Sequence, residues 1–170
     1  MQPFLGLGQG GLGKALERTA LAVLRIGAVL RLAIGLHGEL ALGEGRVEGR
    51  ALQRSANENI RGYATRIIAD ANYDASALRL SSAEAGVSYA PDGSMGPKTQ
   101  QLLAQLNTLQ GPAFDTAFAQ GQLAVQTDCE AQYGAYSQNG KSGPLKRFAQ
   151  VALPKAQGRL ELARRLAGGR

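Results

Sequence analysis

The sequence predicts an all-α protein, an up-and-down bundle of helices, and two observations favour this fold class. Apolar residues recur every three to four positions over long stretches of residues 57–167, which is the period of a helix that buries one face. Aromatic residues make up 5% of the chain and tryptophan is absent. The core must therefore be built from Ala, Leu, Val and Ile, which suit closely packed helices better than a sheet.

The first long helix is expected at residues 57–85. Asn57 is a natural N-cap residue, because its side chain can accept a hydrogen bond from a backbone N–H group of the first turn. An apolar stripe at helical spacing then runs from Ile60 to Leu78. Gly86 ends the helix, since glycine commonly terminates helices.

Two further long helices and one short helix are expected after a loop rich in proline and glycine at residues 86–97. The short helix covers residues 98–109 and turns its leucines inward. The long helices cover residues 111–137 and 145–167. Pro154 lies inside the last of them and should bend it or loosen one turn. With these elements the chain forms three long helices and one short extra helix, and no segment has the pattern of a strand.

The first fifty residues form an atypical segment rich in Gly, Leu and Arg, so the helical-bundle domain is expected at residues 51–170. A helix is predicted at residues 15–42 from its apolar run. Arg25 and Arg31 interrupt this run. They argue against a transmembrane span and against the unbroken apolar core of a signal peptide.

Charge is distributed unevenly along the chain, whose formal net charge is +6. Residues 67–140 carry two basic and seven acidic groups, whereas residues 141–170 carry eight basic groups and one acidic group. A basic C-terminal helix could contact nucleic acid or an anionic surface. Only Phe148 interleaves these basic residues, and base stacking requires more aromatic residues. No specific nucleic-acid partner is therefore expected.

Residues able to perform chemistry are few. His37 is the single histidine, so a di-iron centre, a structural zinc site and most forms of histidine catalysis are excluded. Cys129 is the single cysteine, and on an apolar helix face it is expected to act as a small packed residue. The stretch GLGQGGLGK lacks the spacing of a phosphate-binding loop. The protein is accordingly predicted not to be an enzyme and to hold no cofactor.

The helix expected at residues 111–137 presents an apolar face from Phe114 to Cys129, flanked by Gln122 and Gln126. None of the flanking groups reacts readily. We therefore expect a dry and chemically inert seam where the long helices meet.

Acidic residues give one alternative. Asp70 and Asp74 lie one turn apart, while Asp115, Asp128 and Glu130 lie on the next long helix. Carboxylates on facing helices can bind a cation, which leaves open a metal-linked or redox-linked bundle. Exposed carboxylates that keep a bundle soluble give the same pattern, and a carboxylate in the first helical turn, as expected for Asp115, is favoured by the helix dipole.

Three stretches of residues 51–167 carry a family resemblance: ALQRSANENIRGYATRIIADANYDASAL, LQGPAFDTAF and LKRFAQVALPKAQGRLELARRL. They are similar to a bacterial family of secreted helix bundles that is known only as a domain of unknown function (number 4142). The most specific parts are the GxAFD element at Gly111–Asp115 and the pair Leu153–Pro154. The resemblance implies a four-helix, ferritin-like bundle in the periplasm or cell envelope, without an established activity.

The chain departs from this family at three positions. Family members typically carry histidine where this chain has Ala71, Gln126 and Arg159. If the histidines of the family bind metal, this chain lacks the ligands, because alanine offers no donor, glutamine is a weak neutral ligand and arginine repels cations. We expect a polar cluster in their place, in which Arg159 reaches Gln126 or an acidic neighbour such as Asp70.

The N-terminal segment also departs from the family, which begins with a signal peptide and an acidic, alanine-rich first helix. A wrong start or a shift of reading frame in a GC-rich gene would give such a segment. Residues 15–42 would then take the place of the first helix through hydrophobicity alone, and the incompletely covered bundle would self-associate.

Three functions follow from these observations. The leading prediction is a non-catalytic bundle of the bacterial envelope with a structural or binding role and unknown partners. The alternatives are the metal-linked bundle that uses the Asp cluster, and a weak binder of nucleic acid or anionic surfaces through the basic C-terminal helix.

Overall fold

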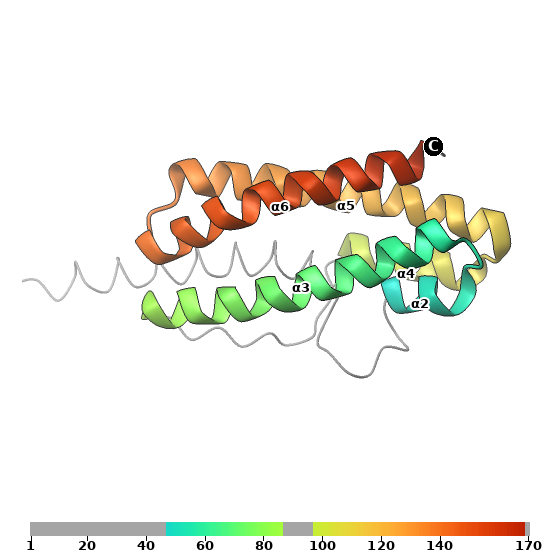
Figure 1. Cartoon of the computed structure of the whole chain (residues 1–170), viewed down its shortest axis with the longest axis horizontal. Coiled ribbons are helices and arrows are strands. Elements are labelled where there is room, and N and C mark those ends of the chain that lie inside the picture. Colours follow the sequence, from blue (N-terminus) through green and yellow to red (C-terminus); the bar gives the residue numbers. More distant parts are fainter. Residues whose placement is uncertain (1–46, 87–96, 169–170) are drawn as a thin grey trace, which may run out of the picture.

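The computed structural model describes residues 47–86 and 97–168 of the 170-residue chain. The helix predicted at residues 15–42 and His37 lie outside the described residues. Within them the chain forms five helices and no strand, so the predicted all-α class is confirmed (Figure 1). The helices are α2 (Val47–Arg54), α3 (Glu58–Glu84), α4 (Pro97–Thr108), α5 (Gly111–Asn139) and α6 (Gly143–Ala167).

The three long helices build the bundle. Figure 1 shows α5 and α6 running side by side in opposite directions, with a short connection between them, and α3 crossing beneath them. The short helices α2 and α4 lie at the end of the bundle where α3 and α5 begin. Helix α2 starts before the domain boundary expected at residue 51, and Val47 and Ala51 are completely buried in the core.

The helix ends follow from local chemistry. The Oδ1 atom of Asn57 accepts a hydrogen bond from the backbone N–H of Asn59 at 2.9 Å, as expected for an N-cap residue. Gly86, with φ of 71°, follows the C-terminal end of α3 in a conformation that other residues rarely adopt. Helix α6 continues through Pro154, whose side chain is exposed. The carbonyl group that loses its N–H partner at this proline can therefore bond to water.

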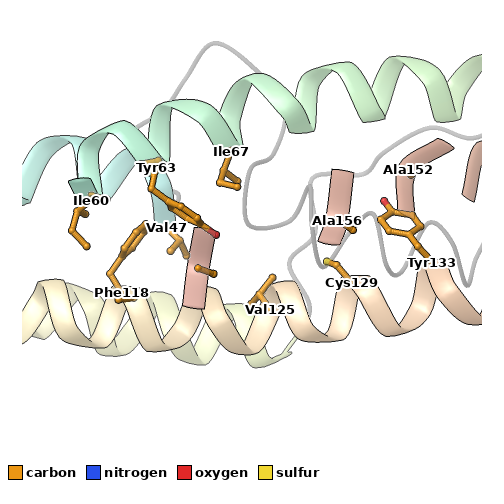
Figure 2. Close-up of a cluster of buried hydrophobic side chains, with 14 of the residues drawn as sticks. Val47, Ile60, Tyr63, Ile67, Phe118, Val125, Cys129, Tyr133, Ala152 and Ala156 are labelled. Carbon is orange, nitrogen blue, oxygen red and sulfur yellow. The ribbon is translucent and has the colours of Figure 1, made fainter. Parts of the chain in front are cut away.

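Aromatic residues on α3 and α5 fill the core at the end where these helices begin. The rings of Phe114 and Phe118 stack at a centroid distance of 6.2 Å. Tyr63 meets Phe118 edge-on at 6.1 Å (Figure 2). Further along the bundle the ring of Tyr133 packs edge-on against Phe148 on α6. Small buried residues on α6 allow close approach of the helices: Ala149, Ala152, Ala156 and Ala163.

Candidate functional site

Buried polar side chains run along the contact between the long helices, so the seam expected to be dry and chemically inert is not lined by apolar residues alone. We call this set the polar seam. Each member is less than a tenth exposed, although charged and amide groups are costly to bury without partners. Its members are Glu48, Tyr63, Asp74, Gln122, Gln126 and Arg159.

One part of the polar seam is a chain of hydrogen bonds from three helices. The Tyr63 hydroxyl donates to Gln122 Oε1 at 3.2 Å, and Gln122 Nε2 donates to Glu48 Oε1 at 2.5 Å. Burial, followed by the charge of Glu48, raises the pKa of Tyr63 above its usual value. The phenol therefore stays protonated and keeps its role as donor.

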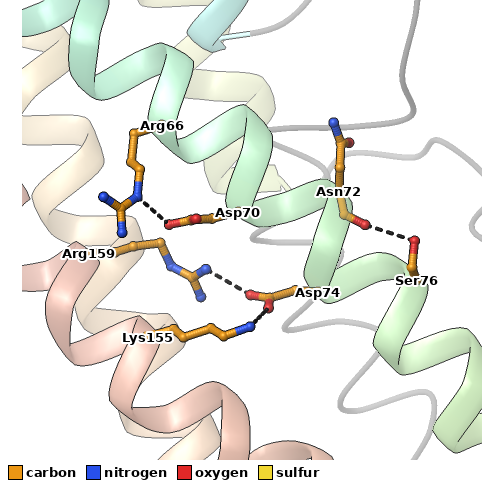
Figure 3. Close-up of polar contacts among 7 residues, drawn as sticks. All are labelled: Arg66, Asp70, Asn72, Asp74, Ser76, Lys155 and Arg159. Carbon is orange, nitrogen blue, oxygen red and sulfur yellow. Dashed lines mark hydrogen bonds and ion pairs between the residues drawn. The ribbon is translucent and has the colours of Figure 1, made fainter.

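A second part is an ion pair between α3 and α6 (Figure 3). Arg159 Nη1 donates to Asp74 Oδ2 at 2.7 Å, and both side chains are 5% exposed. Lys155 Nζ lies 3.4 Å from the other carboxylate oxygen and sits 3.6 Å above the ring centre of Tyr73. Burial alone lowers the pKa of Arg159, but the carboxylate of Asp74 outweighs it, so the net pKa is raised and the guanidinium stays charged.

Gln126, the remaining member of the polar seam, lies on α5 one turn before the buried Cys129. Gln126 is 1% exposed, and neither atom of its amide has a hydrogen-bond partner among the described residues. Its amide nevertheless lies near the Tyr63 hydroxyl and lowers the pKa of that group. Cys129 is completely buried, and burial raises the pKa of its thiol to about 12 although Arg159 opposes the shift. At neutral pH the thiol is therefore protonated and a poor nucleophile.

Three of the four residues expected to form a polar cluster are buried. Ala71, Gln126 and Arg159 are all buried between the long helices. Asp70 does not join them, because it is partly exposed and pairs with Arg66 at 3.2 Å on its own helix (Figure 3). Arg159 reaches an acidic neighbour, as expected, but this neighbour is Asp74, one turn further along α3, and not Asp70.

The acidic residues do not converge on one point. Asp70 pairs with Arg66, whereas Asp74 pairs with Arg159 and Lys155. Within residues 47–86 and 97–168, no three His, Cys, Asp or Glu side chains come close enough to hold a metal ion.

The basic residues of α6 are largely occupied within the chain. Arg147 pairs with Glu84 on α3, and both Arg164 and Arg165 lie beside Glu161. Lys146 Nζ donates to the carbonyl oxygen of Gln138 at 2.9 Å. These contacts reduce the positive surface on which the predicted binding of nucleic acid or anionic surfaces depends.

A groove opens at the end of the bundle where α3 and α5 begin and α6 ends. We call it the end groove. Its volume is about 920 Å³. Buried apolar side chains contribute to its lining, together with polar groups from all three helices. The residues that line it are Asn57, Asn59, Ile60, Gly62, Tyr63, Arg66, Pro112, Asp115, Thr116, Ala119, Leu162, Arg165, Leu166 and Ala167.

Asp115 is the acidic residue of the end groove. Because α5 begins at Gly111, its first turn contains no acidic residue, and the expected helix-dipole explanation for Asp115 is wrong. The Oδ1 atom of Asp115 is buried and has no hydrogen-bond partner among the described residues. The sequence suggested no binding site here, because the groove arises only where three helix ends meet.

Comparison with family models confirms the resemblance. The model for the domain of unknown function 4142 (DUF4142) matches residues 44–166. Comparison with curated proteins and with solved structures gave no match. Among the helices of the described part of the chain, none combines the length and apolar character needed to cross a membrane.

Proposed function

Since the chain belongs to the DUF4142 family, we propose that it is a non-catalytic bundle of the bacterial cell envelope with a structural or binding role. The observation that carries this proposal is the buried ion pair between Asp74 and Arg159. It lies among the positions where the family resemblance implies histidines. The location in the envelope is supported by the family resemblance alone.

The ion pair makes the centre of the bundle unsuited to a metal cation. The guanidinium of Arg159 has no lone pair to donate and repels cations. The carboxylate of Asp74 already contacts two positive groups, Arg159 and Lys155. Gln126 adds only a neutral amide, and the thiol of Cys129 is held in its protonated form.

The same groups argue against nucleophilic or acid–base catalysis in the polar seam. Catalytic groups need a pKa near the working pH, whereas the pKa values of Tyr63, Cys129 and Arg159 are all shifted upward, away from neutrality. The polar seam therefore supports a role in fixing how α3, α5 and α6 pack, which suits a scaffold or binding protein.

Metal titration of the full chain tests the proposal. Thermal unfolding is followed by far-ultraviolet circular dichroism with Fe²⁺, Mn²⁺ or Zn²⁺ at micromolar concentration. We expect the melting temperature to be unchanged by each metal. A metal-dependent rise that disappears in Asp74→Asn and persists in Asp128→Asn would overturn the proposal and favour the metal-linked alternative.

A further inference from the structure

We propose that the end groove binds an amphiphilic anion, an alkyl chain that ends in a carboxylate, and that Arg66 and Arg165 hold the carboxylate. This inference rests on the binding role within the proposed function, and it assigns that role a site and a class of ligand. It is carried by the volume of the groove, by its apolar surface and by the two guanidinium groups of its lining.

The volume and surface of the end groove suit a small molecule with an apolar chain. Its volume of about 920 Å³ falls within the range of small-molecule sites, roughly 300–1,000 Å³. Ile60 on α3 and Ala119 on α5 are buried side chains of the lining. Leu162, which is 37% exposed, and Leu166 extend this apolar surface along α6. An alkyl chain that covered these side chains would remove them from water.

The two arginines of the lining offer the hydrogen bonds that a carboxylate accepts. A guanidinium carries five N–H donors in a planar fork. Arg66 uses its Nε donor for Asp70, at 3.2 Å, and Arg165 uses its Nε donor for Glu161, also at 3.2 Å. The Nη groups of both arginines have no hydrogen-bond partner among the described residues. The two side chains are 65% and 66% exposed, so a ligand can reach these Nη groups without breaking either ion pair.

Charge in the lining favours a ligand with one negative charge. Arg66 and Arg165 stand against a single carboxylate, that of Asp115, so the lining has one positive charge in excess. The Oδ1 atom of Asp115 is buried and out of reach of a ligand. Glu161 lies outside the lining and is shared, because Arg164 Nη1 is 3.8 Å from its other oxygen. One carboxylate thus serves two guanidiniums at the end of α6.

The other polar groups of the lining are committed in ways that leave donors. The Oδ1 atom of Asn57 accepts from the backbone N–H of Asn59 at 2.9 Å, which leaves the side-chain NH₂ group of Asn57 as a donor. The hydroxyl of Tyr63 donates to Gln122, so the ring is the part of Tyr63 left to contact a ligand. The groove therefore offers N–H donors beside an apolar surface, and an alkyl carboxylate combines the matching acceptor and chain.

Arg164 provides a matched control for Arg165. The two residues are neighbours on α6, both lie beside Glu161, and their side chains are 60% and 66% exposed. Only Arg165 belongs to the lining of the groove. Replacement of either arginine by glutamine removes one positive charge from the same region. A difference between the two variants therefore reports contact with the ligand and not net charge.

Two glycines allow the end groove to be blocked without disturbing the fold. Gly62 lines the groove, and a Cβ atom added there meets nothing within 4 Å. Gly158 on α6 is equally open and exposed but lies outside the lining. Both are helical positions at which a larger residue also favours the helix. Gly62→Leu therefore fills the groove, and Gly158→Leu is its matched control.

Isothermal titration calorimetry of the full chain with octanoate tests the proposal. We expect saturable binding to one site. Arg66→Gln, Arg165→Gln and Gly62→Leu should each weaken binding by at least about tenfold, equivalent to about 1.4 kcal/mol. Arg164→Gln and Gly158→Leu should leave binding unchanged. Circular dichroism of each variant verifies that it is folded.

Two further probes separate the parts of the ligand. Acetate carries the carboxylate without the alkyl chain and should bind at least about 100-fold more weakly. Octylammonium carries the chain with the opposite charge and should not compete. The proposal is overturned if octanoate shows no saturable binding, if octylammonium binds as tightly as octanoate, or if both variants of the lining arginines bind octanoate as tightly as the unaltered chain. The metal titration is independent of these results, so failure of this site would leave the scaffold role standing.

Discussion

Helix α3 carries two aspartates one turn apart whose surroundings are opposite. Asp70 pairs with Arg66 on its own helix, with side-chain exposures of 25% and 65%. Asp74 pairs with Arg159 on α6, and both side chains are 5% exposed. Figure 3 shows the two pairs close together. The residue types are the same, so burial and the origin of the partner make the difference.

The two pairs should therefore contribute to folding in different ways. An exposed pair gains little, because water and salt screen the attraction. A buried pair has lost its hydration, and its attraction mainly compensates for that loss. The Asp74–Arg159 pair consequently adds little net stability, but it penalises every arrangement of α3 against α6 that separates the two charges.

Removal of one buried charge should have the largest effect. Arg159→Ala leaves Asp74 buried with Lys155 as its remaining cation, and breaking such a pair typically costs about 3–5 kcal/mol. We expect a loss of this size in the free energy of unfolding measured with urea. A loss below about 1 kcal/mol would show that Asp74 regains water easily, and the contrast with Asp70 would collapse.

A double variant separates specificity from stability. Replacing Asp74 by Leu together with Arg159 by Met removes both charges and keeps apolar volume. Since buried pairs can often be replaced in this way without loss, most of the stability lost in Arg159→Ala should return. Urea unfolding of the double variant measures this recovery.

The two buried glutamines on α5 extend the same comparison to neutral groups. Gln122 bonds to both Tyr63 and Glu48, so Gln122→Leu should reduce the free energy of unfolding by about 1–3 kcal/mol. Gln126 has no hydrogen-bond partner among the described residues. Gln126→Leu should therefore increase this free energy, by about 1 kcal/mol. Urea unfolding of both variants measures these changes in the free energy of unfolding. An equal loss of this free energy in both variants would contradict the prediction.

The sequence contains the signal that separates the two aspartates. Asp74 falls on the buried stripe of α3 that also includes Ile67, Ala71 and Leu78, at spacings of three and four residues. Asp70 lies beside this stripe. Gln126 and Arg159 could be placed in the interior from the sequence, because they stand at positions where the family resemblance implies histidines. The sequence alone could not show which acidic residue pairs with Arg159, because this depends on how α3 and α6 are rotated about their axes.

Helix ends were predictable where a single residue determines them, as at Asn57 and Gly86. Helix α2 was not predicted, because eight residues that include Gly49 give too little periodic pattern. The end groove had no signal either. Its walls come from residues more than forty positions apart in the chain, which become neighbours only when the helices pack.

Cys129 tests how dry the surroundings of the buried ion pair are. Its thiol pKa is raised from 9.0 to about 12, so the unfolded chain ionises at lower pH than the folded chain. The stabilising effect of the protonated thiol is complete below pH 9 and is lost as the pH rises toward 12. By pH 10 we expect a loss of about 1 kcal/mol in the free energy of unfolding.

Cys129→Ala is the control for this pH dependence, because the raised pKa of Tyr63 acts in the same direction and remains in the variant. Urea unfolding between pH 8 and pH 10 should show a shallower decline in the variant than in the unaltered chain. Equal slopes would show that the thiol is hydrated, and that the surroundings of Arg159 are as accessible to water as those of Arg66.

The exposed pair should give the smallest effect. Arg66→Ala removes the partner of Asp70, but the arginine is 65% exposed and the carboxylate can be hydrated instead. Exposed pairs at this spacing on a helix contribute about 0.3–0.5 kcal/mol, and we expect a loss no larger than this in urea unfolding. Because screening weakens exposed pairs, the difference should vanish in 1 M salt, whereas the loss in Arg159→Ala should persist. If the loss in Arg66→Ala persisted in high salt, the two ion pairs would act as one network. Arg66 would then support Asp74 and Arg159 through Asp70.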